Sequence, residues 1–385
     1  MKKGIVISLA SAGVIAAVVA GLSISNSASV SADEGTSLGS PGVVAANFKD
    51  GALSEAISEE DCTLTNGTKT TCYRVIVAGD PVGTKIGPFC PTTTTTSAAD
   101  AGIWLDGSKI YNTDGQFILD LATIYGDAKW KLYDETGKVN VTDSKAAFQG
   151  AAKPDVEEAY KYHCVEGRFE WTNTGKAVPI SVLVPVNPVK ASSAVTSQGA
   201  DLGVALNGVV IAASAPVDAI LGAYTIAAFD DCGGHFNPIE GYHMHAYTNC
   251  EGADYGSKIT DVNAETSLIG YAMDGVGVFA PLANDSTIEL DDCNGRTTAK
   301  DGYHYYAQSP EKNKILKCYM GLTAVDSSKA DGNGPPAGNG PPAGGMLPPE
   351  LLVIIGGSVV LLVGGGITLT VVLLRRKKSK AAKNA

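Results

Sequence analysis

Residues 230–246 read DDCGGHFNPIEGYHMHA, and residues 291–307 read DDCNGRTTAKDGYHYYA. Both segments fit the pattern D-D-C-x-G-x-x-x-x-x-[ED]-G-Y-H-x-x-A without a gap. Together they hold four of the five histidines of the chain. Agreement at so many fixed positions indicates an internal duplication. The copies differ in chemistry, because His235 and His245 of the first correspond to Arg296 and Tyr306 of the second.

The first copy contains the strongest candidate for a metal site. His243 and His245 form an H-x-H pair, and on a strand two such side chains project from the same face. His235 follows a Gly-Gly pair on a turn that could bring a third imidazole to the same ion. Neutral imidazole is a ligand for zinc or copper, which are the cofactors that we expect. The remaining candidate ligands are His304, at the equivalent place in the second copy and expected to face His243, and, more weakly, Asp231 and Asp292.

Other interpretations of these residues stay open. Histidines beside Tyr and Gly can be hydrogen-bonded core residues, and Asp-Asp-Cys more often caps a turn than binds metal. Between the copies, residues 268–281 read LIGYAMDGVGVFAP, where Asp274-Gly275 favours a hairpin turn between two apolar runs. The functional alternative makes Asp274 a ligand or a general base, and it is the one weak catalytic candidate.

The fold class expected is mainly β with a few short helices, stabilised by disulfides. Strands are predicted at 73–78, 177–186 and 203–212, the last with a turn at Asn207-Gly208. A helix is predicted within 142–152, with Asp143 or Ser144 before an Ala-rich turn, and another within 155–163, after Pro154.

Both ends of the chain predict an exported, anchored protein. Lys2 and Lys3 precede an apolar stretch and a small-residue region ending at Ala32, as in a signal peptide. Residues 351–374 carry no charge, and basic residues follow, which predicts a single membrane span with a cytoplasmic tail. The expected organisation is a signal peptide (1–32), an N-terminal segment (33–60), a first lobe (61–190), a second lobe with both copies (200–325), a Pro/Gly stalk (331–350), the span (351–374) and a basic tail (375–385).

The charge of the predicted extracellular part excludes one class of partner. The two ends hold only basic charges, so residues 33–350 contain 21 Lys and Arg against 40 Asp and Glu. Such an acidic surface repels nucleic acid, and we expect no nucleic-acid partner. The membrane is the partner predicted, and the sequence does not identify an extracellular ligand.

All eight cysteines lie in the exported part, which predicts four disulfides. The duplication suggests that each copy is closed by its own bond, Cys232–Cys250 and Cys293–Cys318. The spacing of the other four cysteines does not fix their connectivity, and Cys62–Cys72 with Cys90–Cys164 is one of the pairings open to them. Three acceptor sequons predict a glycoprotein in a host that glycosylates, at Asn66, Asn140 and Asn284.

Four segments together resemble the YHYH-domain family: GVALNGVVI (203–211), DDCGGH with GYHMH (230–245), IGYAMDG (269–275) and LDDCNG with GYHYY (290–306). The resemblance is good over roughly residues 200–320 and extends more weakly back to about residue 60. It implies a secreted or surface protein, and it implies no established biochemical activity. Neither copy has a complete Tyr-His-Tyr-His, because the first reads YHMH and the second reads YHYY.

Three functions are compatible with these features. The first is a surface-anchored module that binds one transition-metal ion through the clustered histidines. The second is a structural or adhesive surface protein with packing histidines. The third is an extracellular metal-dependent hydrolase or oxidase, which is the least favoured because no second catalytic motif accompanies the histidines.

Overall fold

The computed structural model describes residues 36–196, 201–248 and 265–326. These residues form mostly short strands, with three α-helices and several single-turn 3₁₀ segments. The strands are β1 (Ser58–Thr63), β2 (Lys69–Val77), β3 (Ile103–Leu105), β4 (Ile110–Asn112), β5 (Cys164–Val165), β6 (Ile180–Pro185), β7 (Lys190–Val195), β8 (Asp201–Ala205), β9 (Val210–Ala212), β10 (Ile226–Ala227), β11 (Gly234–Asn237), β12 (Gly241–Met244), β13 (Leu268–Ala272), β14 (Gly277–Phe279), β15 (Gly295–Thr298), β16 (Gly302–Tyr306) and β17 (Tyr319–Gly321). The helices are α1 (Gly115–Ile124), α2 (Lys145–Ala151) and α3 (Val217–Gly222).

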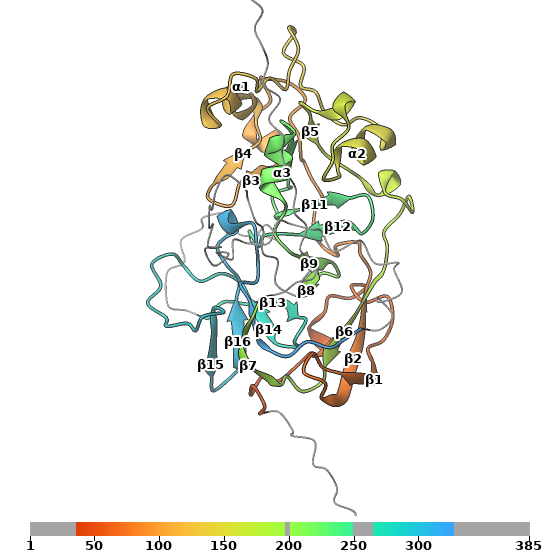
Figure 1. Cartoon of the computed structure of the whole chain (residues 1–385), viewed down its shortest axis with the longest axis vertical. Helices are drawn as coiled ribbons and strands as arrows, with labels where there is room; N and C mark the ends of the chain where they lie inside the picture. Colours follow the sequence, from red (N-terminus) through yellow and green to blue (C-terminus); the bar gives the residue numbers. More distant parts are fainter. Residues whose placement is uncertain (1–35, 197–200, 249–264, 327–385) are drawn as a thin grey trace, which may run out of the picture. The chain divides into compact units, whose positions relative to one another are not determined.

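An eight-stranded sheet organises the duplicated region, with the strand order β11-β12-β9-β8-β13-β14-β16-β15 (Figure 1). Each half consists of two hairpins joined by a parallel pair, β9 with β12 in the first half and β14 with β16 in the second. The halves meet at the antiparallel pair β8 and β13. From either edge inward, the sheet therefore begins with the hairpin of one seventeen-residue copy, followed by the hairpin that precedes that copy in the chain. The duplicated unit is a four-stranded half-sheet and not the seventeen-residue segment alone.

The hairpins that join the halves share their turn chemistry. In the first, the Gly208 amide donates to the Ala205 carbonyl, and in the second the Gly275 amide donates to the Ala272 carbonyl. Both glycines have positive φ, at 93° and 81°, which an L-side chain rarely adopts. Both predicted turns, at Asn207-Gly208 and at Asp274-Gly275, are confirmed.

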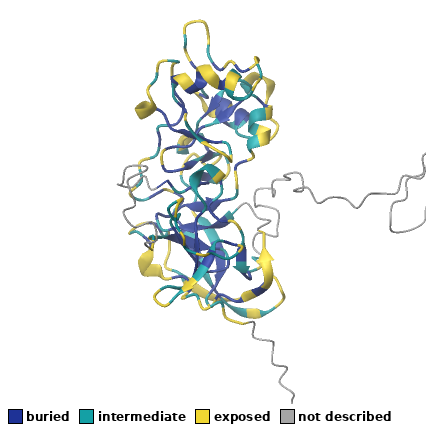
Figure 2. Ribbon diagram, turned by 90° about the vertical axis from the view of Figure 1, so that its left-hand side faces the viewer, coloured by how far each residue is buried: buried dark blue, intermediate teal, exposed yellow. Residues whose placement is uncertain are grey.

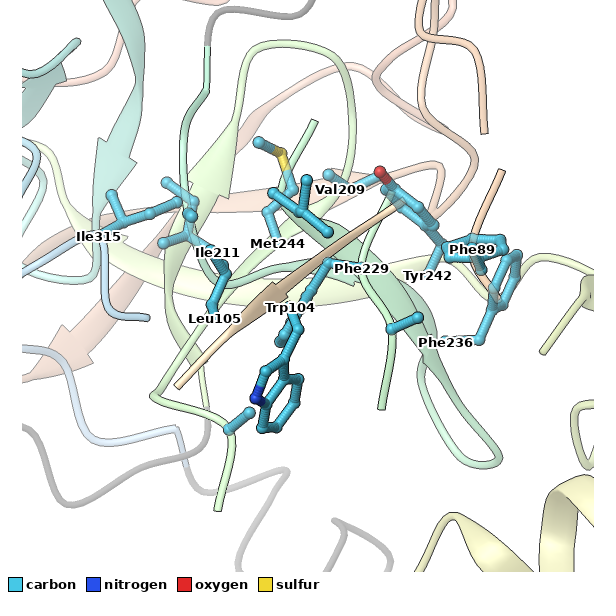
Figure 3. Close-up of a cluster of buried hydrophobic side chains, with 14 of the residues drawn as sticks. Phe89, Trp104, Leu105, Val209, Ile211, Phe229, Phe236, Tyr242, Met244 and Ile315 are labelled. Atoms are coloured by element: carbon cyan, nitrogen blue, oxygen red, sulfur yellow. The ribbon is translucent and has the colours of Figure 1, made fainter. Parts of the chain in front are cut away.

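Hydrophobic cores cover both faces of this sheet. On one face, valines of β2 and β6, such as Val75 and Val182, pack with Val204, Val210 and Tyr271. The larger core includes Ile211 and Met244 together with residues from the region before the sheet (Figure 3). Buried residues follow the strands of this sheet, whereas exposed residues lie on loops, on outer helical surfaces and along β1 and β7 (Figure 2). This larger core takes side chains from both predicted lobes. Residues 190–195, at the end of the first predicted lobe, form β7 and pair with β17.

The predicted secondary structure is confirmed in most places. Strands β2, β6, β8 and β9 lie where they were predicted, and α2 begins after an N-cap at Ser144, whose hydroxyl accepts from the Ala147 amide. The predicted helix at 155–163 is wrong, because only the 3₁₀ turn Glu158–Tyr160 forms there. Tyr162 has a φ of 61°, which a right-handed helix does not permit.

Three disulfides are described: Cys62–Cys72, Cys90–Cys164 and Cys293–Cys318. They are the pairs that the sequence suggested. Cys232 is also disulfide-bonded, and Cys250, its predicted partner, lies outside the described residues. At the sequons, Asn66 and Asn284 are exposed, whereas the Asn140 side-chain amide donates to the Tyr162 carbonyl.

No helix within the described ranges is long and apolar enough to cross a membrane. The signal peptide predicted at 1–32, the stalk at 331–350, the span at 351–374 and the tail at 375–385 all lie outside those ranges.

Candidate metal centre

The first Asp of each copy builds the turn that carries the histidine hairpin. The Asp230 carboxylate is fully buried and accepts the amides of Cys232 and Gly234 on one oxygen. Its other oxygen accepts the Tyr242 hydroxyl at 2.8 Å and the Gly87 amide at 3.3 Å. Burial raises the pKa of Asp230 to about 6, although these four donors favour the charged form.

The second copy repeats this arrangement. Asp291 accepts the amides of Cys293 and Gly295 on one oxygen and the Tyr303 hydroxyl, at 2.7 Å, on the other. Each glycine leaves room for the tyrosine, because a Cβ at Gly295 would lie 2.1 Å from the Tyr303 hydroxyl oxygen. The shared Asp, Gly and Tyr therefore stabilise the same turn in each copy. This structural role explains why all three residues occur in both copies, and no ligand is needed to explain it.

Three histidines of the first copy meet on one face of the β11–β12 hairpin. His235 on β11 is the cross-strand partner of His243 on β12, and His245 follows two residues later. One ring nitrogen from each of the three lies within 4.8 Å of the other two. The Nε2 atoms of His235 and His245 are 3.1 Å apart. Two nitrogens on one zinc ion, each bonded at about 2.0–2.1 Å, lie about 3.3 Å apart in tetrahedral geometry, so this spacing suits a shared ion.

Hydrogen bonding fixes the orientation of His243. Its Nδ1 lies 3.0 Å from the Gly241 carbonyl and donates to it, which leaves the Nε2 lone pair available. Burial lowers the pKa of His243 and lowers those of His235 and His245 well below the usual value. The imidazoles are therefore neutral at neutral pH, which is the form that binds a metal.

Packing around the histidines is tight, but their hydrogen bonding is incomplete. His243 and His245 are 4% and 5% exposed, and the Phe229 ring stacks on His235 with centroids 4.5 Å apart. The buried Nδ1 of His245 makes no well-formed hydrogen bond. Burial lowers the pKa of this histidine, and the nearby Ala213 backbone only partly opposes that shift. The three-imidazole group thus contains one buried ring nitrogen, Nδ1 of His245, without a well-formed hydrogen bond.

The other candidate ligands lie elsewhere. His304, expected to face His243, is on β16, five strand spacings from β12 or about 24 Å along the sheet. The expectation that His304 faces His243 was wrong, because the two halves of the sheet meet through β8 and β13 and not through the two copies. Asp231 and Asp292 are exposed beside their turns, and the described group of metal-ligating side chains contains neither.

Asp274 also lies away from the histidines. It accepts the Tyr305 hydroxyl at 2.6 Å and the amides of Gly321 and Val276, and burial raises its pKa to about 6. It thereby joins the β13–β14 turn to β16 and β17. The structure supports the turn interpretation and does not place this carboxylate beside the three imidazoles.

Sequence reasoning missed two residues beside the histidine positions. Phe229 precedes the Asp-Asp-Cys segment and packs on His235. Glu265 contacts Arg296 and Tyr306 in the second half. In the sequence, only Arg296, which stands at the position equivalent to His235, indicated that a carboxylate such as Glu265 lies nearby.

Comparison with known proteins supports the domain interpretation. A family model described as YHYH protein matches residues 181–288. This part of the chain is a YHYH domain. The match runs from β6 past β14 and includes the Tyr242–His245 signature. It ends before the second copy, whereas the sequence resemblance continues to about residue 320. The chain matches no curated protein and no solved structure.

Proposed function

We propose that the YHYH domain binds one transition-metal ion, zinc or copper, through His235, His243 and His245. The observation that carries this proposal is the convergence of three neutral imidazoles within 4.8 Å. The β15–β16 hairpin has the same strand pairing as the β11–β12 hairpin but only one of the three histidines. The fold of the hairpin therefore does not require three histidines, which supports a ligand-binding role for them. Zinc and copper both accept nitrogen ligands, and a water molecule can complete the coordination.

We also propose that the domain acts at the cell surface, held by a single span at 351–374. The uncharged C-terminal stretch and the basic residues after it support this proposal. The described disulfides support export, because such bonds persist outside the cytoplasm. Protease treatment of intact cells should degrade the domain and leave a membrane-embedded fragment. A domain released by carbonate washing would contradict the anchor.

The metal site predicts a defined metal content. We expect the full-length chain to retain about one equivalent of zinc or copper, measured by mass spectrometry, because three ligands bind one ion. Chelation should lower the melting temperature by at least about 4 °C, since an ion at a hundred times its Kd stabilises the fold by about 2.7 kcal/mol. The double variant His243→Ala/His245→Ala should contain no metal and should not respond to chelation.

The matched control is His304→Ala, which removes the corresponding histidine of the second hairpin. This variant should keep its metal. A native chain without metal, and with a melting temperature unchanged by added zinc or copper, would contradict the proposal.

The second candidate is a structural surface protein in which the histidines pack a core. The stacking of Phe229 on His235 and the 3.1 Å contact between two imidazole nitrogens favour it, because neutral rings can bond each other. In that case the double variant loses stability, while neither protein holds metal.

An enzymatic function has weaker support. Two cavities of the described part, of about 100 and 240 Å³, are lined by other residues, the first including Ile211 and Met244 and the second Tyr306 and Lys312. Met244 alternates with the histidines along β12, so the first cavity borders the opposite face of that strand.

A further inference from the structure

The second hairpin places three different side chains where the first hairpin has its histidines. Arg296 on β15 pairs across the strands with His304 on β16, as His235 pairs with His243. Tyr306 takes the place of His245. Three groups that offer nitrogen lone pairs to a cation are thus replaced by a guanidinium, a phenol and one imidazole, which can all donate hydrogen bonds.

Two of these side chains, Arg296 and Tyr306, donate hydrogen bonds to one carboxylate. Arg296 donates to Glu265 Oε1 at 2.6 Å, and the Tyr306 hydroxyl donates to Glu265 Oε2. His304 Nε2 lies 3.8 Å from the same Oε2 and 3.1 Å from the Tyr306 hydroxyl oxygen. The His304 ring is oriented as in the first copy, with Nδ1 3.0 Å from the Gly302 carbonyl. The hairpin therefore binds both oxygens of a carboxylate through different donors.

The carboxylate comes from outside the hairpin. Glu265 lies shortly before β13. The next residue, Thr266, donates a hydrogen bond from its hydroxyl to the carbonyl of Ala280, just after β14. The side chains of Glu265 and Arg296 are 34% and 29% exposed, so water reaches the ion pair. A carboxylate from solution can approach from the same side. In such an exposed pair, the intramolecular contact adds little stability and is open to competition.

We propose that the second hairpin is a binding site for a small carboxylate, which the chain's own Glu265 occupies in this structure. The site recognises the carboxylate through Arg296 and Tyr306, and His304 Nε2 lies beside the Tyr306 hydroxyl. A cavity of about 240 Å³ borders the same tyrosine, and its lining mixes apolar residues such as Leu282 and Leu290 with polar ones such as Asn294 and Lys312. Room of this kind favours an acid larger than acetate. This inference does not depend on metal binding by the first hairpin.

Acetate rescue tests the proposal in the full-length chain. Glu265→Ala removes the internal occupant and leaves space for acetate. We expect acetate, compared with chloride at equal ionic strength, to raise the melting temperature of this variant. Titration should show that the variant binds acetate at least ten times more tightly than the native chain, in which Glu265 competes. Glucuronate should bind more tightly than acetate, and glucose should not bind.

The control is the double variant Glu265→Ala/Arg296→Gln, which lacks the guanidinium and should lose the acetate response. If Glu265→Ala fails to fold, Glu265→Ser provides the same test with a polar side chain. An equal response to acetate in all variants would overturn the proposal, as would no response in a folded Glu265 variant. Because acetate binding should also survive metal chelation, failure of this test is distinguishable from failure of the metal proposal.

Discussion

Replacing Asp230 by alanine is expected to cost roughly 3–5 kcal/mol of the free energy of unfolding. The carboxylate is 0% exposed and accepts hydrogen bonds from four donors, at Cys232, Gly234, Tyr242 and Gly87. Removing it leaves these donors buried without acceptors, and each such loss costs about 1–3 kcal/mol before water or local shifts compensate. Total stabilities are about 5–15 kcal/mol, so the variant is expected to be poorly folded at 37 °C.

The matched variant is Asp291→Ala in the second copy. Asp291 accepts three described donors rather than four and is only partly buried, so water can replace it more readily. Its loss should be about half as large. Urea denaturation followed by circular dichroism measures both variants, and equal losses would show that burial at Asp230 is not the decisive factor.

This comparison separates structural from functional meaning in the repeated segment. Asp, Gly and Tyr recur in both copies because each copy needs the same turn, as the bonds of Asp230 and Asp291 show. His235 and His245 do not take part in that turn, and the residues at these two positions differ between the copies. A repeated pattern in one chain therefore identifies the scaffold, and its differences identify the chemistry.

Local features of the fold were predictable from sequence. The Asn207-Gly208 and Asp274-Gly275 turns need positive φ at glycine, and the α2 cap needs a side-chain acceptor at Ser144. The three-histidine group was also predictable, because the alternation of a strand and one tight hairpin bring these residues together. All of these contacts span few residues.

The arrangement of the two halves was not predictable by the same reasoning. Pairing of β8 with β13 joins residues far apart in the chain, such as Val204 and Tyr271, and no local signal specifies it. Because of this pairing, the two halves extend in opposite directions from β8 and β13, and His304 lies far from His243. The contact of Glu265 with Arg296 is likewise set by the chain path before β13, and a lone arginine does not reveal its partner.

The junction of the halves leads to a second large expected effect, at Gly203 on β8. A Cβ at Gly203 would lie 2.2 Å from the Tyr271 carbonyl oxygen and 3.1 Å from the Ala272 Cα, both backbone atoms of β13. Backbone atoms in a paired strand cannot rotate away as a side chain can, so Gly203→Ala must separate β8 from β13. Overpacking in a well-packed core typically costs about 1–3 kcal/mol, and we expect about 3 here.

Gly222→Ala is the control for this variant. No atom lies within 4 Å of a Cβ at Gly222, the last residue of α3, and alanine is favoured over glycine in helices by roughly 0.5–1 kcal/mol. The control should therefore be neutral or slightly more stable in the same urea titration. If Gly203→Ala matched it, the close approach of β8 and β13 would not be required for the fold. A loss confined to Gly203→Ala would instead establish that contact between the two half-sheets, rather than the stability of each hairpin, limits the stability of the YHYH domain.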